Sequence, residues 1–148
     1  MLDAAGEVEL KDVEEEDAPG LLELLRHLTD APDLDSSTLR AIAEARRQAG
    51  IVTRVLVHRP TRRVVGTASL FVEPKFSRGG KSVGHIEDVV VDPSYRGKKL
   101  GQALVCDLCD IARSRDCYKV ILDSAETSVE FYKKLGFRSL ERQMRLDL

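Results

Sequence analysis

A short basic loop between an apolar strand and an apolar helix is the part of this sequence best suited to bind a charged ligand. Residues 96–101 read Arg-Gly-Lys-Lys-Leu-Gly and follow the apolar run at 89–91. Backbone amides at a helix N-terminus bind anions, and the basic side chains add positive charge. Gly97 allows a tight turn, and Gly101 allows a ligand to approach the helix. The spacing predicts a pyrophosphate site, and a solvated basic turn is the alternative if the loop is taken alone.

Two adjacent acidic residues, Glu87 and Asp88, are candidates for binding an amine or sugar hydroxyls. Strict alternation along the strand at 82–91 predicts two faces, with His85, Glu87 and Val89 on one and Ile86, Asp88 and Val90 on the other. A carboxylate beside the core is costly unless it is paired, so a structural salt bridge is the alternative to a ligand contact. Asp123 ends a later strand, where its alternative role is to cap a helix that begins near Ser124.

Basic and hydroxyl side chains gather in the loop at 73–81. Lys75, Ser77 and Arg78 carry donors that can bind a phosphate through charge-assisted hydrogen bonds. A solvated basic loop is the alternative. Later in the chain, Lys119 could meet a phosphate or remain solvated.

Tyr132 is a candidate proton donor on a short helical segment. A phenol, with an ordinary pKa near 10, can donate a proton or a hydrogen bond. A core aromatic is the alternative, because Tyr132 and Val129 share a helix face. Cys106 and Cys109 have the C-x-x-C spacing of zinc and redox sites, but two further ligands at metal spacing are missing. We therefore expect free thiols and no metal.

The elements that position these residues follow from the hydrophobic pattern. The pattern predicts strands at 8–13, 51–58, 63–72, 82–91, 117–123 and 137–146, and helices at 17–28, 37–49, 100–115 and 128–135. The strand–helix–strand crossover at 82–123 implies a parallel pair in a mixed sheet. We expect one α/β domain over residues 1–148.

The composition limits the classes of partner. The chain has 148 residues, 43% of them hydrophobic, and 23 basic against 25 acidic residues give a net charge of −2. This balance argues against general nucleic-acid binding. No apolar run approaches the roughly 20 residues of a membrane helix, and the acidic N-terminal segment lacks the features of a signal peptide. We expect no nucleic-acid or membrane partner and an intracellular, cytoplasmic location.

The basic loop resembles the acetyl-CoA motif Q/R-x-x-G-x-G/A of the GCN5-related N-acetyltransferase (GNAT) family. Arg96, Leu100 and Gly101 fit the motif, and Lys99 replaces its middle glycine. The resemblance implies the GNAT fold, a central mixed, mostly antiparallel sheet flanked by helices, with acetyl-CoA as co-substrate. The cofactor contacts that it implies are Val89, Val90, Val91, Arg96, Gly97, Lys98, Lys99, Leu100, Gly101, Gln102, Tyr132, Lys133 and Lys134.

Three segments resemble the glucosamine 6-phosphate N-acetyltransferases more closely: 84–91 (GHIEDVVV), 117–123 (CYKVILD) and 129–137 (VEFYKKLGF). This resemblance implies direct acetyl transfer to the 2-amino group of D-glucosamine 6-phosphate in a ternary complex, a step of UDP-GlcNAc biosynthesis. Asp123 would orient the amine, and Tyr132 would serve the leaving thiolate. The implied substrate contacts are Thr29, Lys75, Ser77, Arg78, Glu87, Asp88, Tyr118, Lys119, Asp123 and Arg145.

The resemblance also implies a homodimer with shared active sites, formed through the last strand, with Arg142 and Arg145 as cross-subunit phosphate contacts. Two other functions fit the chain. One is a GNAT enzyme for a polyamine or protein amine, and the other is a non-catalytic acyl-CoA-binding module. The basic cluster of Lys75, Arg78 and Lys81 favours an anionic acceptor over a polyamine.

Overall fold

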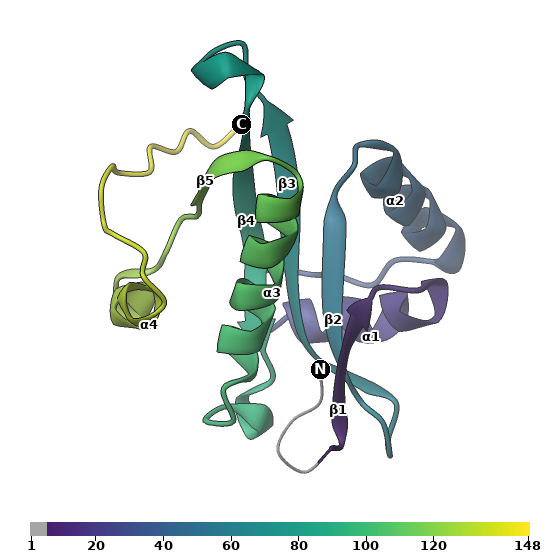
Figure 1. The fold of residues 1–148 in the computed structure, drawn as a ribbon. Helices are drawn as coiled ribbons and strands as arrows, with labels where there is room; N and C mark the ends of the chain where they lie inside the picture. Colours follow the sequence, from purple (N-terminus) through teal and green to yellow (C-terminus); the bar gives the residue numbers. More distant parts are fainter. Residues whose placement is uncertain (1–5) are drawn as a thin grey trace.

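One five-stranded sheet runs through the computed structural model, which describes residues 6–148 (Figure 1). The strands lie in the order β1 (Val8–Asp12), β2 (Val52–His58), β3 (Arg63–Pro74), β4 (Ser82–Val91) and β5 (Cys117–Ile121). The helices are α1 (Ala18–Leu25), α2 (Ser36–Gln48), α3 (Leu100–Ser114) and α4 (Val129–Lys134). Only the β4–β5 pair is parallel, so the predicted mixed, mostly antiparallel sheet is confirmed.

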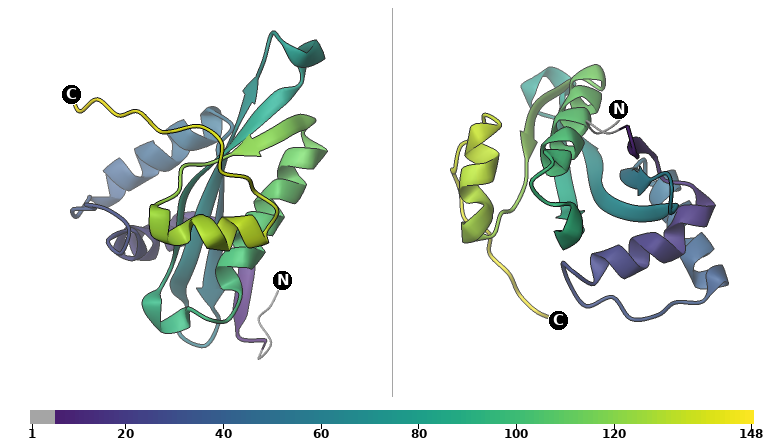
Figure 2. Two further views of the ribbon diagram at one scale, coloured as in Figure 1. Left: turned by 90° about the vertical axis from the view of Figure 1, so that its left-hand side faces the viewer. Right: turned by 90° about the horizontal axis from the view of Figure 1, so that it is seen from below.

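The two faces of the sheet pack against different helices, as the view from below shows (Figure 2, right). On one face, Leu104 and Leu108 of α3 are fully buried against a cluster that includes Leu70. On the other face, Leu24 of α1 packs against Val90 and its neighbours. Each fully buried leucine contributes roughly 1.5–3 kcal/mol to folding. The apolar stripes of α1 and α3 therefore fix both helices on the sheet.

Helix α2 differs from the other long helices because none of its residues is buried. It begins as its sequence predicts, with the Asp35 carboxylate accepting a hydrogen bond of 2.7 Å from the Thr38 amide. Gly50 follows its end with φ 73°. The helix stands apart from the sheet (Figure 1), and a cleft of about 1790 Å³ is lined by α1, α2 and the sheet. No described helix is long and apolar enough to cross a membrane.

One extra residue interrupts β4. Thr67 pairs with Val90 and Ser69 pairs with Glu87, so two residues of β4 lie opposite one residue of β3. The backbone of Asp88 is strained, with φ 54°, a conformation that residues with side chains rarely adopt. This arrangement is a β-bulge, which redirects the side chains beyond it.

The bulge makes the predicted alternation along β4 wrong. Ile86 packs under α3, Val89 packs against the same cluster, and Val90 packs with α1 on the opposite face. The period of two breaks at the inserted residue, so Ile86 and Val90 do not share a face. Glu87 and Asp88 are both exposed, although alternation placed one of them at the core.

The predicted final strand at 137–146 is also absent, since β5 is the last strand among residues 6–148. The segment leaves the body as an extended tail (Figure 2, left) and exposes Leu140, Met144 and Leu146. An extended segment becomes a strand only when its backbone pairs with another strand, and the described chain brings none to it. Three predicted ends also move by two residues or more: α1 ends at Leu25, β3 at Pro74 and β5 at Ile121, so Asp123 lies beyond β5.

Candidate active site

Strands β4 and β5 separate just before residues 89–91, which are predicted to contact the cofactor. Their last ladder pair is His85–Ile121, while β4 continues to Val91 beside β3. The backbone from Glu87 to Val91 therefore has no strand neighbour on the β5 side. Such an edge offers N–H and C=O groups to an extended ligand. The predicted contacts Val89, Val90 and Val91 lie along this edge.

The basic loop begins at a fixed carboxylate. Asp92 is buried and accepts hydrogen bonds from the Ser94 hydroxyl and the Ser94 amide at 2.6 and 2.9 Å. These bonds hold its pKa below the ordinary value, with a further contribution from the Arg63 guanidinium. The chain then turns through Gly97, at φ 80°, and Lys99, at φ 60°, to enter α3.

The loop has the charge and free donors that a pyrophosphate needs. Arg96, Lys98 and Lys99 form no ion pair with any residue in 6–148, and the Lys98 Nζ lies 5.1 Å from the centre of the Tyr95 ring. Lys99 immediately precedes α3 and supplies no side-chain cap to its first amides. Uncapped amides at the positive end of the helix dipole, surrounded by unpaired cations, fit a diphosphate.

Gly101, in the first turn of α3, lies beside α4. A Cβ at this position would make ordinary contacts, 3.4 Å from the Phe131 Cζ and 3.8 Å from the Val91 Cγ2. This proximity places the segment that carries Tyr132 next to the loop.

Tyr132 combines a packed ring with a free hydroxyl. Its ring makes edge contacts with Phe131 and Phe137, at centroid distances of 5.0 and 5.7 Å, and packs against the cluster under α3. Burial raises the pKa of its phenol, so the proton stays on the oxygen at neutral pH. The hydroxyl makes no hydrogen bond within the described chain. Nearby, Lys133 is paired with Glu130 at 3.1 Å, whereas Lys134 has no ion pair among residues 6–148.

Three predicted acidic residues gather where β4 and β5 part. Burial, then the negative charges of Asp88 and Asp123, raise the pKa of Glu87. None of the three carboxylates forms a salt bridge or hydrogen bond with another described residue, so the salt-bridge alternative is wrong. The capping alternative for Asp123 is also wrong, because Ala125 precedes the next helical turn (Glu126–Ser128). Unpaired carboxylates held together are suited to an ammonium.

The basic hairpin, formed by residues 73–81 where β3 turns into β4, is held by specific contacts at Lys75, whereas residues 76–81 are exposed. Lys75 Nζ donates to Glu73 Oε2 at 2.9 Å, and His85 Nε2 lies 2.9 Å from Glu73 Oε1. The hydrogen bonds from Lys75 and then His85 lower the pKa of Glu73. Sequence analysis missed Glu73, although its position two residues before Lys75 on a strand was the available signal.

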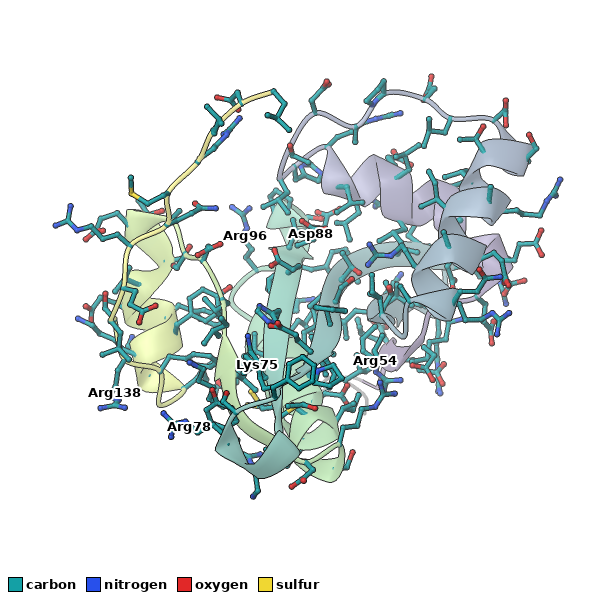
Figure 3. The ribbon with its side chains drawn as sticks, turned by 90° about the horizontal axis from the view of Figure 1, so that it is seen from above. Arg54, Lys75, Arg78, Asp88, Arg96 and Arg138 are labelled. Atoms are coloured by element: carbon teal, nitrogen blue, oxygen red, sulfur yellow. The ribbon has the colours of Figure 1, made fainter. Side chains whose placement is uncertain are left out.

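Arg78 and Lys119 both lie over one aromatic ring. The Arg78 Cζ is 5.0 Å and the Lys119 Nζ 5.5 Å from the centre of the Tyr118 ring, which belongs to β5. Ser77 precedes the helical turn that holds Arg78. Figure 3 looks down on the hairpin, which carries Lys75 and Arg78, while Asp88 lies farther along β4. The structure thus brings these predicted phosphate ligands to one end of the sheet.

Two predicted substrate residues stay apart from this group. Thr29 follows α1, where its amide donates to the Leu25 carbonyl at 3.0 Å. Arg145 lies in the tail and pairs with Asp147. Neither residue contacts another predicted site residue within the described part of the chain.

Comparison with known proteins identifies the family of this chain. Residues 18–137 match the acetyltransferase (GNAT) family. A glucosamine 6-phosphate N-acetyltransferase of Trypanosoma brucei brucei is 64% identical over 142 residues, which cover 96% of this chain and 97% of that protein. This chain belongs to the glucosamine 6-phosphate N-acetyltransferase family within the GNAT enzymes.

Solved structures agree with this membership. The crystal structure of the glucosamine-6-phosphate N-acetyltransferase from Arabidopsis thaliana matches with a TM-score of 0.92 and 35% identity, covering 95% of this chain and 97% of that one. That of an acetyltransferase from Trypanosoma brucei matches with a TM-score of 0.93 and 64% identity, covering 95% and 99%. The GNAT fold predicted from the sequence is confirmed.

Proposed function

We propose that this chain transfers the acetyl group of acetyl-CoA to the 2-amino group of D-glucosamine 6-phosphate. The products are N-acetyl-D-glucosamine 6-phosphate and CoA, which places the reaction in UDP-GlcNAc biosynthesis. The observation that carries the proposal is the position of the unpaired carboxylates beside the free edge of β4. The close relative that bears this enzyme's name supports it.

Acetyl-CoA supplies an acetyl group activated as a thioester. Residues 96–102 would hold its pyrophosphate through the unpaired cations and the first amides of α3. The pantetheine arm would run along the edge at 89–91, where backbone groups of β4 have no strand neighbour. Lys134 is free to reach a further phosphate.

The acceptor would lie with its phosphate at the hairpin and its amine at the acidic cluster. Lys75 and Arg78 supply the charge for the phosphate, with Ser77, Lys119 and Tyr118 beside them. We assign Thr29 and Arg145 to the same substrate on the family resemblance.

The nitrogen of the acceptor loses two protons during the reaction. The bound ammonium first loses one proton to solvent, so that the neutral nitrogen can form the bond to the acetyl carbon, with Asp123 orienting the amine. As that bond forms, Glu87 takes the second proton, because its raised pKa makes it a stronger base than an ordinary glutamate. As the carbon–sulfur bond breaks, Tyr132 gives its phenolic proton to the sulfur. Glu87 then loses its proton and Tyr132 regains one by exchange with solvent.

Direct transfer between two bound reactants is favoured over an acetyl-cysteine intermediate. Burial raises the pKa of the Cys109 and Cys117 thiols, which lowers their thiolate fraction. Cys106 is exposed and has no histidine partner within the described residues. Positioning of the two reactants would supply much of the acceleration.

We propose a homodimer in which the tail of each subunit pairs with the other. The exposed apolar side chains of Leu140, Met144 and Leu146 support this assembly. It would carry Arg142 and Arg145 to the partner's site. We also propose an intracellular, cytoplasmic location, supported by three cysteines that are free.

The reaction is tested by incubating the protein with acetyl-CoA and glucosamine 6-phosphate and identifying the product by NMR. We expect an N-acetyl group on C2 and an equal amount of free CoA thiol. Asp123→Asn should reduce the rate strongly while the acetyl-CoA KM stays the same. Acetylation of an oxygen, or no acetylated sugar, would contradict the proposal.

A further inference from the structure

Helix α2 is held to the sheet mainly through one side chain. Arg46 Nη2 donates to the Ser69 Oγ at 2.7 Å and to the Thr53 Oγ1 at 3.2 Å. The helix buries no residue, and Ile42 on its apolar side is 44% exposed. The other polar contact between α2 and an earlier segment joins the largely exposed Arg40 and Glu15 at 3.4 Å.

The acceptors of Arg46 are built into the sheet. Thr53 and Ser69 are cross-strand neighbours on β2 and β3, and only 9% and 4% of their surfaces are exposed. Their hydroxyl oxygens lie 3.4 Å apart. Buried hydroxyls in an apolar sheet are costly unless they are hydrogen-bonded, so this pair makes a fixed docking point for the guanidinium.

The docking point lies beside the acidic cluster. Ser69 pairs across the sheet with Glu87, and the bulge that carries Asp88 begins at this pair. Arg46, Ser69 and Asp88 line the same cleft, whose outer wall is formed by α2. The loop at 96–102 does not line this cleft. Asp88 is the acceptor residue in this lining, while Glu87, Asp123, Lys75 and Arg78 lie outside it. The position of α2 therefore shapes the space beside Asp88 but not the cofactor loop.

We propose that Arg46 is a positioning residue that fixes α2 as the wall of the acceptor cleft. The proposal rests on the proposed function, since it assigns the part of this cleft beside Asp88 to the acceptor. Without the Arg46 hydrogen bonds, the helix keeps no buried contact to define its position. Displacement of α2 would then change the cleft that the acceptor contacts. The loop that binds acetyl-CoA would keep its structure.

The test compares Arg46→Met, which keeps the side-chain length but removes the donors, with Arg47→Met as the matched control. Arg47 is the next residue of α2, is exposed, and pairs only with Glu44 on the same helix. We expect Arg46→Met to raise the KM for glucosamine 6-phosphate about tenfold, the size expected for loss of hydrogen bonds from a charged donor. The KM for acetyl-CoA should not change. Ser69→Ala, which removes one acceptor from the sheet, should act in the same direction.

Hydrogen–deuterium exchange gives a readout that does not depend on activity. Amides at 36–48 should exchange about tenfold faster in Arg46→Met than in Arg47→Met, while those of α3 stay unchanged. Unchanged exchange at 36–48 would overturn the proposal, as would an equal rise in both KM values. If the unmodified protein does not acetylate glucosamine 6-phosphate, the proposed function fails, and the exchange comparison alone decides whether Arg46 holds α2.

Discussion

The basic side chains of this protein differ in whether they have carboxylate partners. Arg59 and Arg62, for example, lie in the turn between β2 and β3 and pair with Glu9 and Glu16. Arg96, Lys99 and the other cations of the loop and the hairpin end have no such partner within residues 6–148, except for Lys75, which pairs with Glu73, and Lys81, which pairs with Asp116. These unpaired cations lie where the two anionic ligands are proposed to bind. Their positive charge is therefore free to bind phosphate groups. At the scale of single residues, the proposed function depends on charged groups that have no ion-pair partner within the described chain.

The Tyr132 hydroxyl can be tested by Tyr132→Phe. We expect kcat to fall at least about tenfold, because general acid catalysis contributes roughly 10²–10⁴-fold and water can replace part of it. The KM for acetyl-CoA should stay the same, since the ring contacts with Phe131 and Phe137 are retained. CoA thiol release measures both parameters, and Tyr95→Phe is the control for loss of a hydroxyl elsewhere. A full-rate Tyr132→Phe enzyme would remove the phenol from the mechanism.

The pH profile tests Glu87 as the proton acceptor. Glu87 must be ionised to accept a proton, so kcat falls as the pH falls through its pKa. Because that pKa is raised above 4.5 by burial and then by the charges of Asp88 and Asp123, the fall should begin at a higher pH than for an isolated glutamate. Asp88→Asn removes one of these charges and should shift the acidic limb of kcat to lower pH. A limb that does not move would show that Glu87 does not control it.

At the scale of elements, local patterns were predictable and long-range ones were not. The strand–loop–helix unit at 82–114 follows from a continuous apolar strand, a glycine turn and a helical stripe, all within one segment. The bulge at Asp88 left no sequence signal, because it depends on the register with β3. Arg46 was also missed, since in sequence it resembles the solvated Arg47. Its acceptors, Thr53 and Ser69, become neighbours only when β2 pairs with β3.

The cofactor loop can be tested as an element by the double variant Lys98→Met/Lys99→Met. We expect the KM for acetyl-CoA to rise roughly tenfold, because two charge-assisted phosphate contacts are lost. The KM for glucosamine 6-phosphate should remain unchanged. Arg59→Met is the control, since it removes a cation that pairs with Glu9 on β1. Equal effects of the double variant on both substrates would contradict the assignment of the loop to acetyl-CoA.

At the scale of the whole molecule, the tail has the sequence pattern of a strand but pairs with no strand of the described chain. Its apolar residues at 140, 144 and 146 would share one face of a strand with Arg142, yet no described strand edge receives them. The pattern was predictable, but its partner was not, because we propose that it lies in a second copy.

The dimer is tested by replacing Leu140, Met144 and Leu146 together with aspartate. Charges cannot be buried in an apolar interface without a large cost, so we expect a monomer by sedimentation equilibrium. Leu34→Asp, which alters another exposed apolar residue, should leave the dimer intact. A dimer that survives the triple change would show that the tail does not form the interface.

The choice of acceptor is the central claim for the whole protein. It is tested most directly by measuring kcat/KM from CoA thiol release with glucosamine 6-phosphate, glucosamine and spermidine in parallel. The account predicts that glucosamine 6-phosphate is preferred over both other amines by at least about tenfold, the value of one charge-assisted phosphate contact. Equal or better turnover of glucosamine or spermidine would contradict it.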